Sequence, residues 1–188
     1  MQLKRESTHL GEIVIVAPEV FEDERGFFTE TYRADQFKAL GLPTEFVQDN
    51  HSRSKQGVLR GLHFQYQPPM GNIMRVTYGR AFLVAVDLRK GSPTLGKWWG
   101  AELSAENKKQ MWAPASFARG FCVLSEWAEI QYKVTGLYNQ SADVAIRFDD
   151  PDIGIPWPIS NPQISDRDRN AISLAQWLKT QESDRFRY

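Results

Sequence analysis

The feature that most constrains the fold is a long series of short β-branched and aromatic runs separated by turn residues. Runs of this kind cover residues 12–18, 27–32, 45–50, 58–65, 74–78, 81–88, 97–103, 111–113, 120–124, 128–134 and 144–148. Strands that recur about every 8–12 residues, with turn residues between them, are typical of a sandwich or a barrel. We therefore predict an all-β fold, and we expect one domain that spans residues 1–188.

A few segments depart from the strand pattern. Residues 34–40 have helical spacing and are followed by Gly41 and Pro43, and a second helical stretch covers about residues 174–179. We predict a polar loop at residues 51–57, between two strands. A β architecture that closes or stacks its sheets hides the strand edges and can enclose a cavity, which is a natural ligand site.

Composition and charge exclude some classes of function. The 23 basic residues are balanced by 23 acidic ones, which argues against a general nucleic-acid binder. No apolar run approaches the ~18 residues of a membrane span, and residues 1–12 lack the apolar core of a signal peptide. The lone Cys122 suggests a reducing compartment. We expect a soluble, cytoplasmic protein without a membrane partner.

One histidine lies in a segment that otherwise has the pattern of a buried strand. His63 follows Arg60 by three residues, and an imidazole is well suited to move a proton near neutral pH. It could bind a metal, transfer a proton or pack in the core. In a regular strand His63 and Arg60 lie on opposite faces, so a common site requires a bulge, which we predict at Gly61.

Metal binding by His63 has little support. Metal-binding cupins place two histidines two residues apart on one strand face, whereas His63 is followed by Phe64 and Gln65. His9 and His51 stand in polar segments without paired spacing. Because a stable site needs three or four converging ligands, we expect no metal.

Proton transfer would need partners for His63. Asp168 or Asp166 could fix its tautomer. Tyr132 could deliver a proton, because period two places it on the apolar face of residues 128–134. The alternatives are that the aspartates lie in a solvated capping loop and that Tyr132 is a core residue whose hydroxyl bonds to the backbone. The residues alone leave both alternatives open.

Other polar residues could hold an anionic ligand. Four arginines stand near glycines, turns or aromatic residues, namely Arg25, Arg60, Arg119 and Arg167. If they converged, their guanidinium groups would suit a diphosphate, although each could be an ordinary surface residue. Gln48 and Asn50 share one strand face, so both could reach a polar ligand or simply solvate a strand edge.

The motifs, taken in order, resemble those of the dTDP-4-dehydrorhamnose 3,5-epimerase family. The matching segments lie at residues 23–28, 48–50, 57–65, 87–89, 92–94, 120–125, 132–133, 150–151, 154–158 and 165–168. Each motif alone is weak, but the ordered set is specific and covers residues 10–168.

The resemblance implies a cupin-type jelly-roll β-barrel, a homodimer, and neither metal nor cofactor. It implies conversion of dTDP-4-dehydro-6-deoxyglucose to dTDP-4-dehydrorhamnose. His63 would remove the protons at carbons 3 and 5, Asp168 would orient His63, and Tyr132 would return a proton on the opposite face. The positions expected to contact the nucleotide sugar are Arg25, Glu30, Gln48, Asn50, Arg60, Asn72, Arg119, Tyr138, Asp143 and Arg167.

Three positions depart from the family pattern. Family members commonly carry a lysine in place of Asn72, a histidine in place of Arg119 and a glutamate in place of Asp143. We hypothesise that Arg119 takes over part of the charge lost at position 72. The departures leave open a mono-epimerase that acts on carbon 3 or carbon 5 of another nucleotide sugar. Alternatives from other classes are a non-catalytic cupin that binds a nucleotide sugar and a metal-dependent cupin oxygenase.

Overall fold

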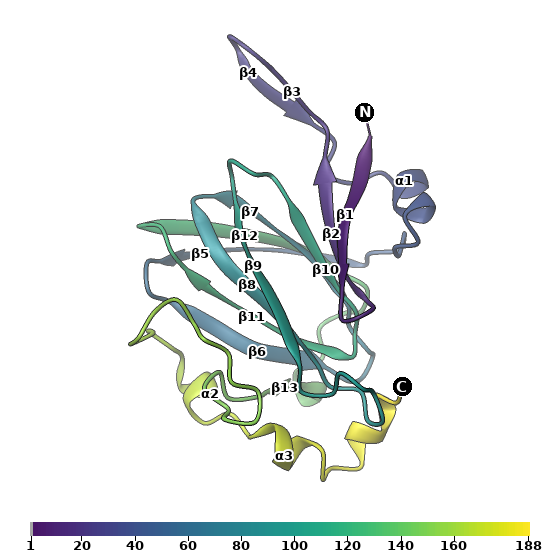
Figure 1. The fold of residues 1–188 in the computed structure, drawn as a ribbon, viewed down its shortest axis with the longest axis vertical. Coiled ribbons are helices and arrows are strands. Elements are labelled where there is room, and N and C mark those ends of the chain that lie inside the picture. The colour runs from purple at the N-terminus through teal and green to yellow at the C-terminus, as the bar shows by residue number, and fades with distance from the viewer. Residues whose placement is uncertain (1) are drawn as a thin grey trace.

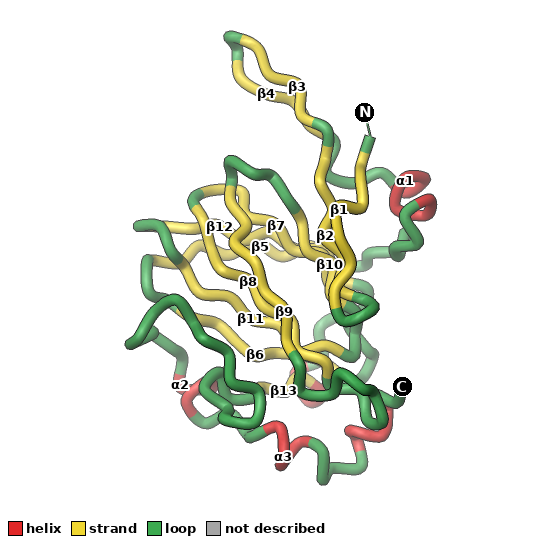
Figure 2. Tube along the Cα trace, viewed as in Figure 1, coloured by secondary structure: helices red, strands yellow, loops and turns green. Residues whose placement is uncertain are grey.

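The computed structural model describes residues 2–188 and contains two large antiparallel sheets (Figures 1 and 2). The six-stranded sheet has the spatial order β1 (Leu3–His9), β2 (Ile13–Pro18), β10 (Gln110–Ala113), β7 (Asn72–Tyr78), β12 (Trp127–Val134) and β5 (Gln48–Lys55). The five-stranded sheet has the order β13 (Asp143–Ala145), β6 (Leu59–Gln65), β11 (Phe117–Val123), β8 (Arg80–Asp87) and β9 (Trp98–Ser104). The predicted all-β architecture is confirmed.

The main hydrophobic core lies between the two sheets. Ile15, Met74 and Ile130 from the six-stranded sheet form one buried cluster with Leu83 and Phe121 from the five-stranded sheet. Side chains alternate between the two faces of a strand, so each of these strands presents every second residue to the cluster.

The five-stranded sheet is buried on its outer face as well. Val84 and Val86 of β8 pack there with Trp177 and Phe186 of the C-terminal segment, which runs beside β6 and β13 in Figure 1. Burial on both faces explains why β8 is an almost continuous apolar run rather than an alternating one.

The helices are short, as predicted. α1 (Ala34–Ala39) buries Phe37 against the outer face of the six-stranded sheet, where Val14 and Trp112 contribute to the same cluster. α2 (Asp166–Arg169) and α3 (Leu174–Trp177) each begin with a serine side-chain cap, a favourable start for a helix. Two 3₁₀ turns, η1 (Gln140–Ala142) and η2 (Glu182–Arg185), complete the elements.

The sequence-based prediction cut β5 short and missed β1. Residues 51–55 do not form a loop, because β5 continues to Lys55 in register with β12. Its inward side chains are polar and border a cavity, so the apolar alternation that marks a strand is missing. β1 was not predicted because most of its side chains are exposed at a sheet edge, and its pairing with β2 is interrupted near Arg5.

A two-stranded hairpin, β3 (Val20–Asp23) and β4 (Gly26–Thr29), projects from the body of the molecule (Figures 1 and 2). It exposes three aromatic side chains, Phe21 at 52%, Phe27 at 60% and Phe28 at 62%. So much exposed aromatic surface on one short hairpin is unusual for a monomer. Across residues 2–188, no helix has the length and apolar character needed to cross a membrane.

Candidate functional site

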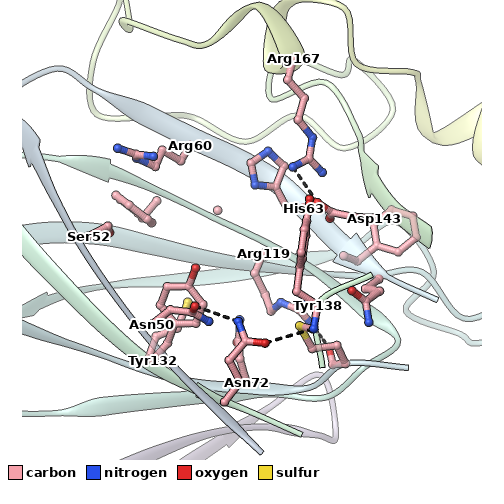
Figure 3. Close-up of a pocket in the computed structure, with 17 residues that line it drawn as sticks. Asn50, Ser52, Arg60, His63, Asn72, Arg119, Tyr132, Tyr138, Asp143 and Arg167 are labelled. Atoms are coloured by element: carbon pink, nitrogen blue, oxygen red, sulfur yellow. Dashed lines mark hydrogen bonds and ion pairs between the residues drawn. The ribbon is translucent and has the colours of Figure 1, made fainter. Parts of the chain in front are cut away.

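A cavity of about 450 Å³ opens between the two sheets. Its walls come from β5, β6, β7, β11, β12 and β13, together with the loop before η1 and with α2. The lining residues are Gln48, Asn50, Ser52, Arg60, His63, Phe64, Gln65, Met70, Asn72, Met74, Arg119, Gly120, Phe121, Tyr132, Tyr138, Asp143 and Arg167 (Figure 3). Polar groups thus converge on a partly apolar pocket, as in many small-molecule sites.

His63 is oriented by a buried carboxylate. Its Nε2 lies 2.5 Å from Oδ1 of Asp168, whose side chain is only 1% exposed. Burial opposes ionisation of Asp168, but the His63 hydrogen bond and charge, the Ser165 hydroxyl and Arg167 together hold the pKa of this carboxyl below its ordinary value. The carboxylate is therefore ionised at neutral pH. It occupies Nε2 of His63, so Nδ1 is the ring nitrogen that remains available for another partner.

The structure distinguishes between the two candidate aspartates. Ser165 caps α2 by accepting a hydrogen bond from the Asp168 N–H at 3.1 Å, and its hydroxyl donates to Oδ2 of Asp168 at 3.0 Å. This short helix directs Asp168 toward β6, whereas Asp166 is 97% exposed and lies near Arg169. Asp168 is the partner of His63.

A bulge brings Arg60 and His63 to the same cavity. In the pairing of β6 with β11, His63 lies opposite Arg119 and Arg60 lies opposite Phe121, so three steps on β6 match two on β11. Gly61 absorbs the irregularity with φ of +139°, and a Cβ there would lie 2.6 Å from Cα of Gly120. The predicted bulge at Gly61 is confirmed, and only glycine fits both the dihedral angle and the space.

Tyr132 lies on the opposite sheet from His63. It belongs to β12, where Ala128, Ile130 and Val134 on the same face are fully buried. The Tyr132 side chain packs against the edge of the core cluster and lines the cavity. Desolvation raises the pKa of the phenol, although the charges of Arg60 and Arg119 oppose this. The group is therefore a protonated donor at neutral pH.

The cavity wall around Tyr138 is held by polar contacts. Gln48 donates from Nε2 to Oδ1 of Asn50 at 2.9 Å and accepts from the Tyr138 N–H at 3.1 Å. Arg167 pairs with Asp143 at 2.7 Å, as the dashed line in Figure 3 shows. These contacts fix the loop before η1 against β5 and place an aromatic ring, 56% exposed, at the cavity wall.

Arg119 and Asn72 lie deeper in the cavity. Arg119 is 6% exposed, and its Nη1 donates to the carbonyl oxygens of Met70 at 2.8 Å and Pro114 at 3.2 Å. Desolvation lowers the pKa of its guanidinium to about 10, so the group stays charged at neutral pH. Asn72 is 7% exposed, and its Oδ1 is buried without a hydrogen-bond partner.

Two of the predicted contact residues lie outside this cavity. Arg25 is on the projecting hairpin and pairs with Asp23 at 2.5 Å, and Glu30 pairs with Arg33 at 3.3 Å. The other predicted site residues line the cavity, except that Asp168 lies behind His63. Sequence reasoning missed Ser52, which shares its strand face with Gln48 and Asn50 and would have been found had β5 been predicted at its full length.

The described part of the chain, residues 2–188, brings together no group of three histidine, cysteine, aspartate or glutamate side chains that could hold a metal ion. The arrangement offers instead a carboxylate-oriented imidazole, a phenol from the facing sheet and several cations. Such a set can remove a proton from one side of a ligand and return one from another.

Known proteins share these features. A family model described as dTDP-4-dehydrorhamnose 3,5-epimerase matches residues 7–176. A dTDP-4-dehydrorhamnose 3,5-epimerase from Shigella flexneri is 51% identical over 165 residues, which are 87% of this chain and 91% of that protein. A dTDP-4-dehydrorhamnose 3-epimerase from Streptomyces niveus is 38% identical over 86% of this chain and 79% of its own length.

A solved structure agrees over the whole chain. The crystal structure of dTDP-6-deoxy-D-glucose-3,5-epimerase from Legionella pneumophila, in complex with dTDP-4-keto-L-rhamnose, superposes with a TM-score of 0.94 at 43% identity. The match covers 100% of this chain and 99% of that one, and it confirms the predicted cupin-type jelly roll. On the sequence match, the shared fold and the cavity together, the chain belongs to the dTDP-4-dehydrorhamnose 3,5-epimerase family.

Proposed function

We propose that the chain epimerises a 4-keto-6-deoxyhexose carried on dTDP, converting dTDP-4-dehydro-6-deoxyglucose to dTDP-4-dehydrorhamnose. The observation that carries the proposal is the His63–Asp168 pair at 2.5 Å in a cavity that Tyr132 enters from the other sheet. Inversion at a carbon needs a base and an acid on opposite sides of the sugar ring. The family membership and the ligand of the Legionella structure support the same substrate class.

The mechanism assigns one step to each group. Nδ1 of His63 takes the proton from carbon 3 or carbon 5, each of which is next to the ketone at carbon 4. The electron pair of the broken C–H bond moves into the enolate, whose charge rests on the ketone oxygen. Asp168 stabilises the imidazolium that forms. Tyr132 then donates its phenolic proton to the opposite face of the carbon. The His63 imidazolium releases its proton to solvent and the Tyr132 phenolate takes one up, so both groups return to their starting states.

The cations at the cavity mouth are suited to the diphosphate. Arg60 and Arg167 are both exposed there and have guanidinium groups that can bind phosphate oxygens in pairs. Gln48 and Asn50 present amides for sugar hydroxyls. The Tyr138 ring stands where it can stack on the nucleotide base, and Asp143 holds Arg167 in position.

The projecting hairpin supports a homodimer. Arg25 and Glu30 match substrate-contact positions of the family, yet neither lines the cavity of its own chain. The hairpin exposes Phe21, Phe27 and Phe28, and a second copy of the chain could bury them. We propose that each hairpin covers the cavity of the other copy, which would bring Arg25 to the substrate.

Action on both carbons is favoured over action on carbon 3 alone. The chain is 51% identical to a 3,5-epimerase and 38% identical to a 3-epimerase. A non-catalytic binding protein would need neither the Asp168 orientation of His63 nor a protonated Tyr132.

Deuterium incorporation tests the proposal. The chain is incubated with dTDP-4-keto-6-deoxyglucose in D₂O, and NMR follows exchange at carbons 3 and 5 separately. We expect deuterium at both carbons and formation of the epimerised sugar. Exchange at one carbon would identify a mono-epimerase, and binding without any exchange would refute the enzymatic function.

A further inference from the structure

Arg119 is the most buried charged residue among those that line the cavity. It is 6% exposed, whereas Arg60 and Arg167 are exposed at the mouth. The cavity therefore has one buried cation, Arg119, and two exposed cations at its mouth. The outer pair can reach a diphosphate that extends toward solvent, and Arg119 can only reach the part of a ligand that enters most deeply.

No carboxylate pairs directly with Arg119. Within residues 2–188, Arg119 forms no ion pair with an acidic side chain. Asp143, the acid whose charge acts on Arg119, pairs directly with Arg167 at 2.7 Å. Among the described residues, the hydrogen bonds of the Arg119 guanidinium run from Nη1 to the carbonyl oxygens of Met70 and Pro114. Burial of a cation that has no directly paired carboxylate costs free energy, so the retention of Arg119 points to an anion that arrives during function.

The position of Arg119 matches the place where negative charge develops. On β11 it is the direct cross-strand partner of His63, and its charge also acts on Tyr132. The carbon that reacts must lie between these two groups, and the ketone carbon is its neighbour. Figure 3 shows Arg119 between the His63 side and the Asn72 side of the cavity.

We propose, on the basis of the function above, that Arg119 is a catalytic residue that donates a hydrogen bond from its guanidinium to the enolate oxygen. The oxygen gains charge as the C–H electron pair shifts and loses it when Tyr132 protonates the carbon, so the guanidinium is neither protonated nor deprotonated. The neighbouring Asn72 supplies an uncharged amide only. Arg119 is thus the cation on which this step depends.

The test separates catalysis from binding. We would measure deuterium exchange into dTDP-4-keto-6-deoxyglucose, and dTDP binding by calorimetry, for Arg119→Gln, Arg119→Lys, and each of these combined with Asn72→Lys. The matched control is Arg75→Gln, because Arg75 is a half-buried arginine on β7 that bonds to Gln131 and does not line the cavity. Thermal unfolding reports whether each variant is folded.

We expect Arg119→Gln to lower kcat for exchange by about 10²-fold, with little change in dTDP affinity. Adding Asn72→Lys to Arg119→Gln should raise kcat for exchange again by at least about tenfold, because the two positions would act on the same oxygen. Arg75→Gln should exchange like the unmodified chain. A purely structural role for Arg119 would give no rescue by a lysine on another strand.

Several outcomes would overturn the inference. One is unchanged exchange in Arg119→Gln, and another is a loss of dTDP binding as large as the loss of exchange, which would make Arg119 a diphosphate ligand. If Arg119→Gln does not fold, Arg119→Lys with and without Asn72→Lys takes its place, and absence of rescue there refutes the inference. If the unmodified chain exchanges no deuterium, the proposed function fails and the inference fails with it.

Discussion

Asp168 is the residue whose role can be tested most directly. Replacing it by asparagine keeps the shape but removes the charge that stabilises the His63 imidazolium, and it can present an N–H to Nε2. We expect Asp168→Asn to lower kcat by about 10²–10⁴-fold. The control is Asp166→Asn on the same helix, since Asp166 is 97% exposed. Equal activity of the two variants in the coupled epimerisation assay would contradict the assignment.

Tyr132→Phe should separate proton removal from inversion. The phenol pKa is raised chiefly by desolvation, so the native side chain holds the proton that inversion requires. Without it, His63 can still remove a proton and return a solvent-derived one to the same face. We expect deuterium exchange to persist while formation of the epimerised sugar falls by about 10²-fold. Parallel loss of both, measured by NMR on one sample, would assign Tyr132 another role.

The sequence was informative at these residues for a physical reason. An isolated histidine in an apolar strand and a tyrosine on an apolar strand face are both visible as exceptions to the local pattern. Which of two aspartates meets His63 depends on how α2 is capped and directed, and no local pattern encodes that. The location of Arg25 depends on where the hairpin lies, so its distance from its own cavity could not be predicted either.

Gly61 tests the bulge that joins Arg60 and His63 in one site. A side chain there meets unfavourable φ and the Gly120 backbone at 2.6 Å. We expect Gly61→Ala to lower the free energy of unfolding by about 2–5 kcal/mol, from left-handed strain and overpacking together. Gly57→Ala is the control, because Gly57 also has positive φ, +79°, but nothing within 4 Å.

Gly57→Ala should lose only the dihedral contribution, about 1–2 kcal/mol. Urea unfolding gives both values. If the two variants lose the same amount, the close approach of β6 to β11 at Gly120 does not constrain position 61.

Asp87 anchors the connection from β8 to β9. It is fully buried and accepts hydrogen bonds from Arg89 at 2.8 and 2.9 Å, Ser92 at 2.7 Å and Thr94 at 2.6 Å. Burial disfavours its charge, but these donors hold the pKa of the carboxyl below its ordinary value. We expect Asp87→Asn to cost about 3–5 kcal/mol of unfolding free energy at pH 7, because it leaves the buried charge of Arg89 without its main partner.

The pH dependence has a defined sign. Folding lowers the pKa of Asp87. The stability that its carboxylate contributes is therefore fully present above the unfolded-state pKa of about 3.9. This stability is lost as the pH falls through the lower pKa of the folded state. The difference between the native chain and Asp87→Asn should therefore shrink below about pH 4. The control is Asp149→Asn, because Asp149 forms an exposed ion pair with Arg147. This change should alter the free energy of unfolding by less than about 0.5 kcal/mol. A difference that stays constant down to pH 3 would contradict this account.

At the scale of whole elements, prediction succeeded where burial is simple. β8 is buried on both faces and β12 has one apolar face, and both strands were predicted from the sequence. β5 was cut short because Asn50, Ser52 and Ser54 face inward but serve a cavity or a polar contact instead of a core. The same chemistry that makes β5 part of a site removes the signal that identifies it as a strand.

At the scale of the whole molecule, the hairpin is the part that a single chain does not explain. Its aromatic side chains lie in solvent, and Arg25 is 85% exposed at its tip. In a dimer of the proposed kind, every cavity would combine His63 of one copy with Arg25 of the other. His63 and Arg25 of the same chain would then serve different cavities. Complementation between two inactive variants can test this arrangement.

The chain variants His63→Asn and Arg25→Ala would be coexpressed with different affinity tags, and total activity would be measured. Each alone should be impaired. If hairpins are exchanged, half of the dimers are mixed and one of the two sites in each is intact, so activity should return to about a quarter of the native value. Coexpression of His63→Asn with Asp168→Asn is the control, because both residues serve the same cavity of one chain and no mixed dimer repairs it. No recovery in the test pair would show that each cavity uses its own hairpin. Recovery in the control would show that coexpression restores activity without hairpin exchange, and it would remove the support that the test pair gives.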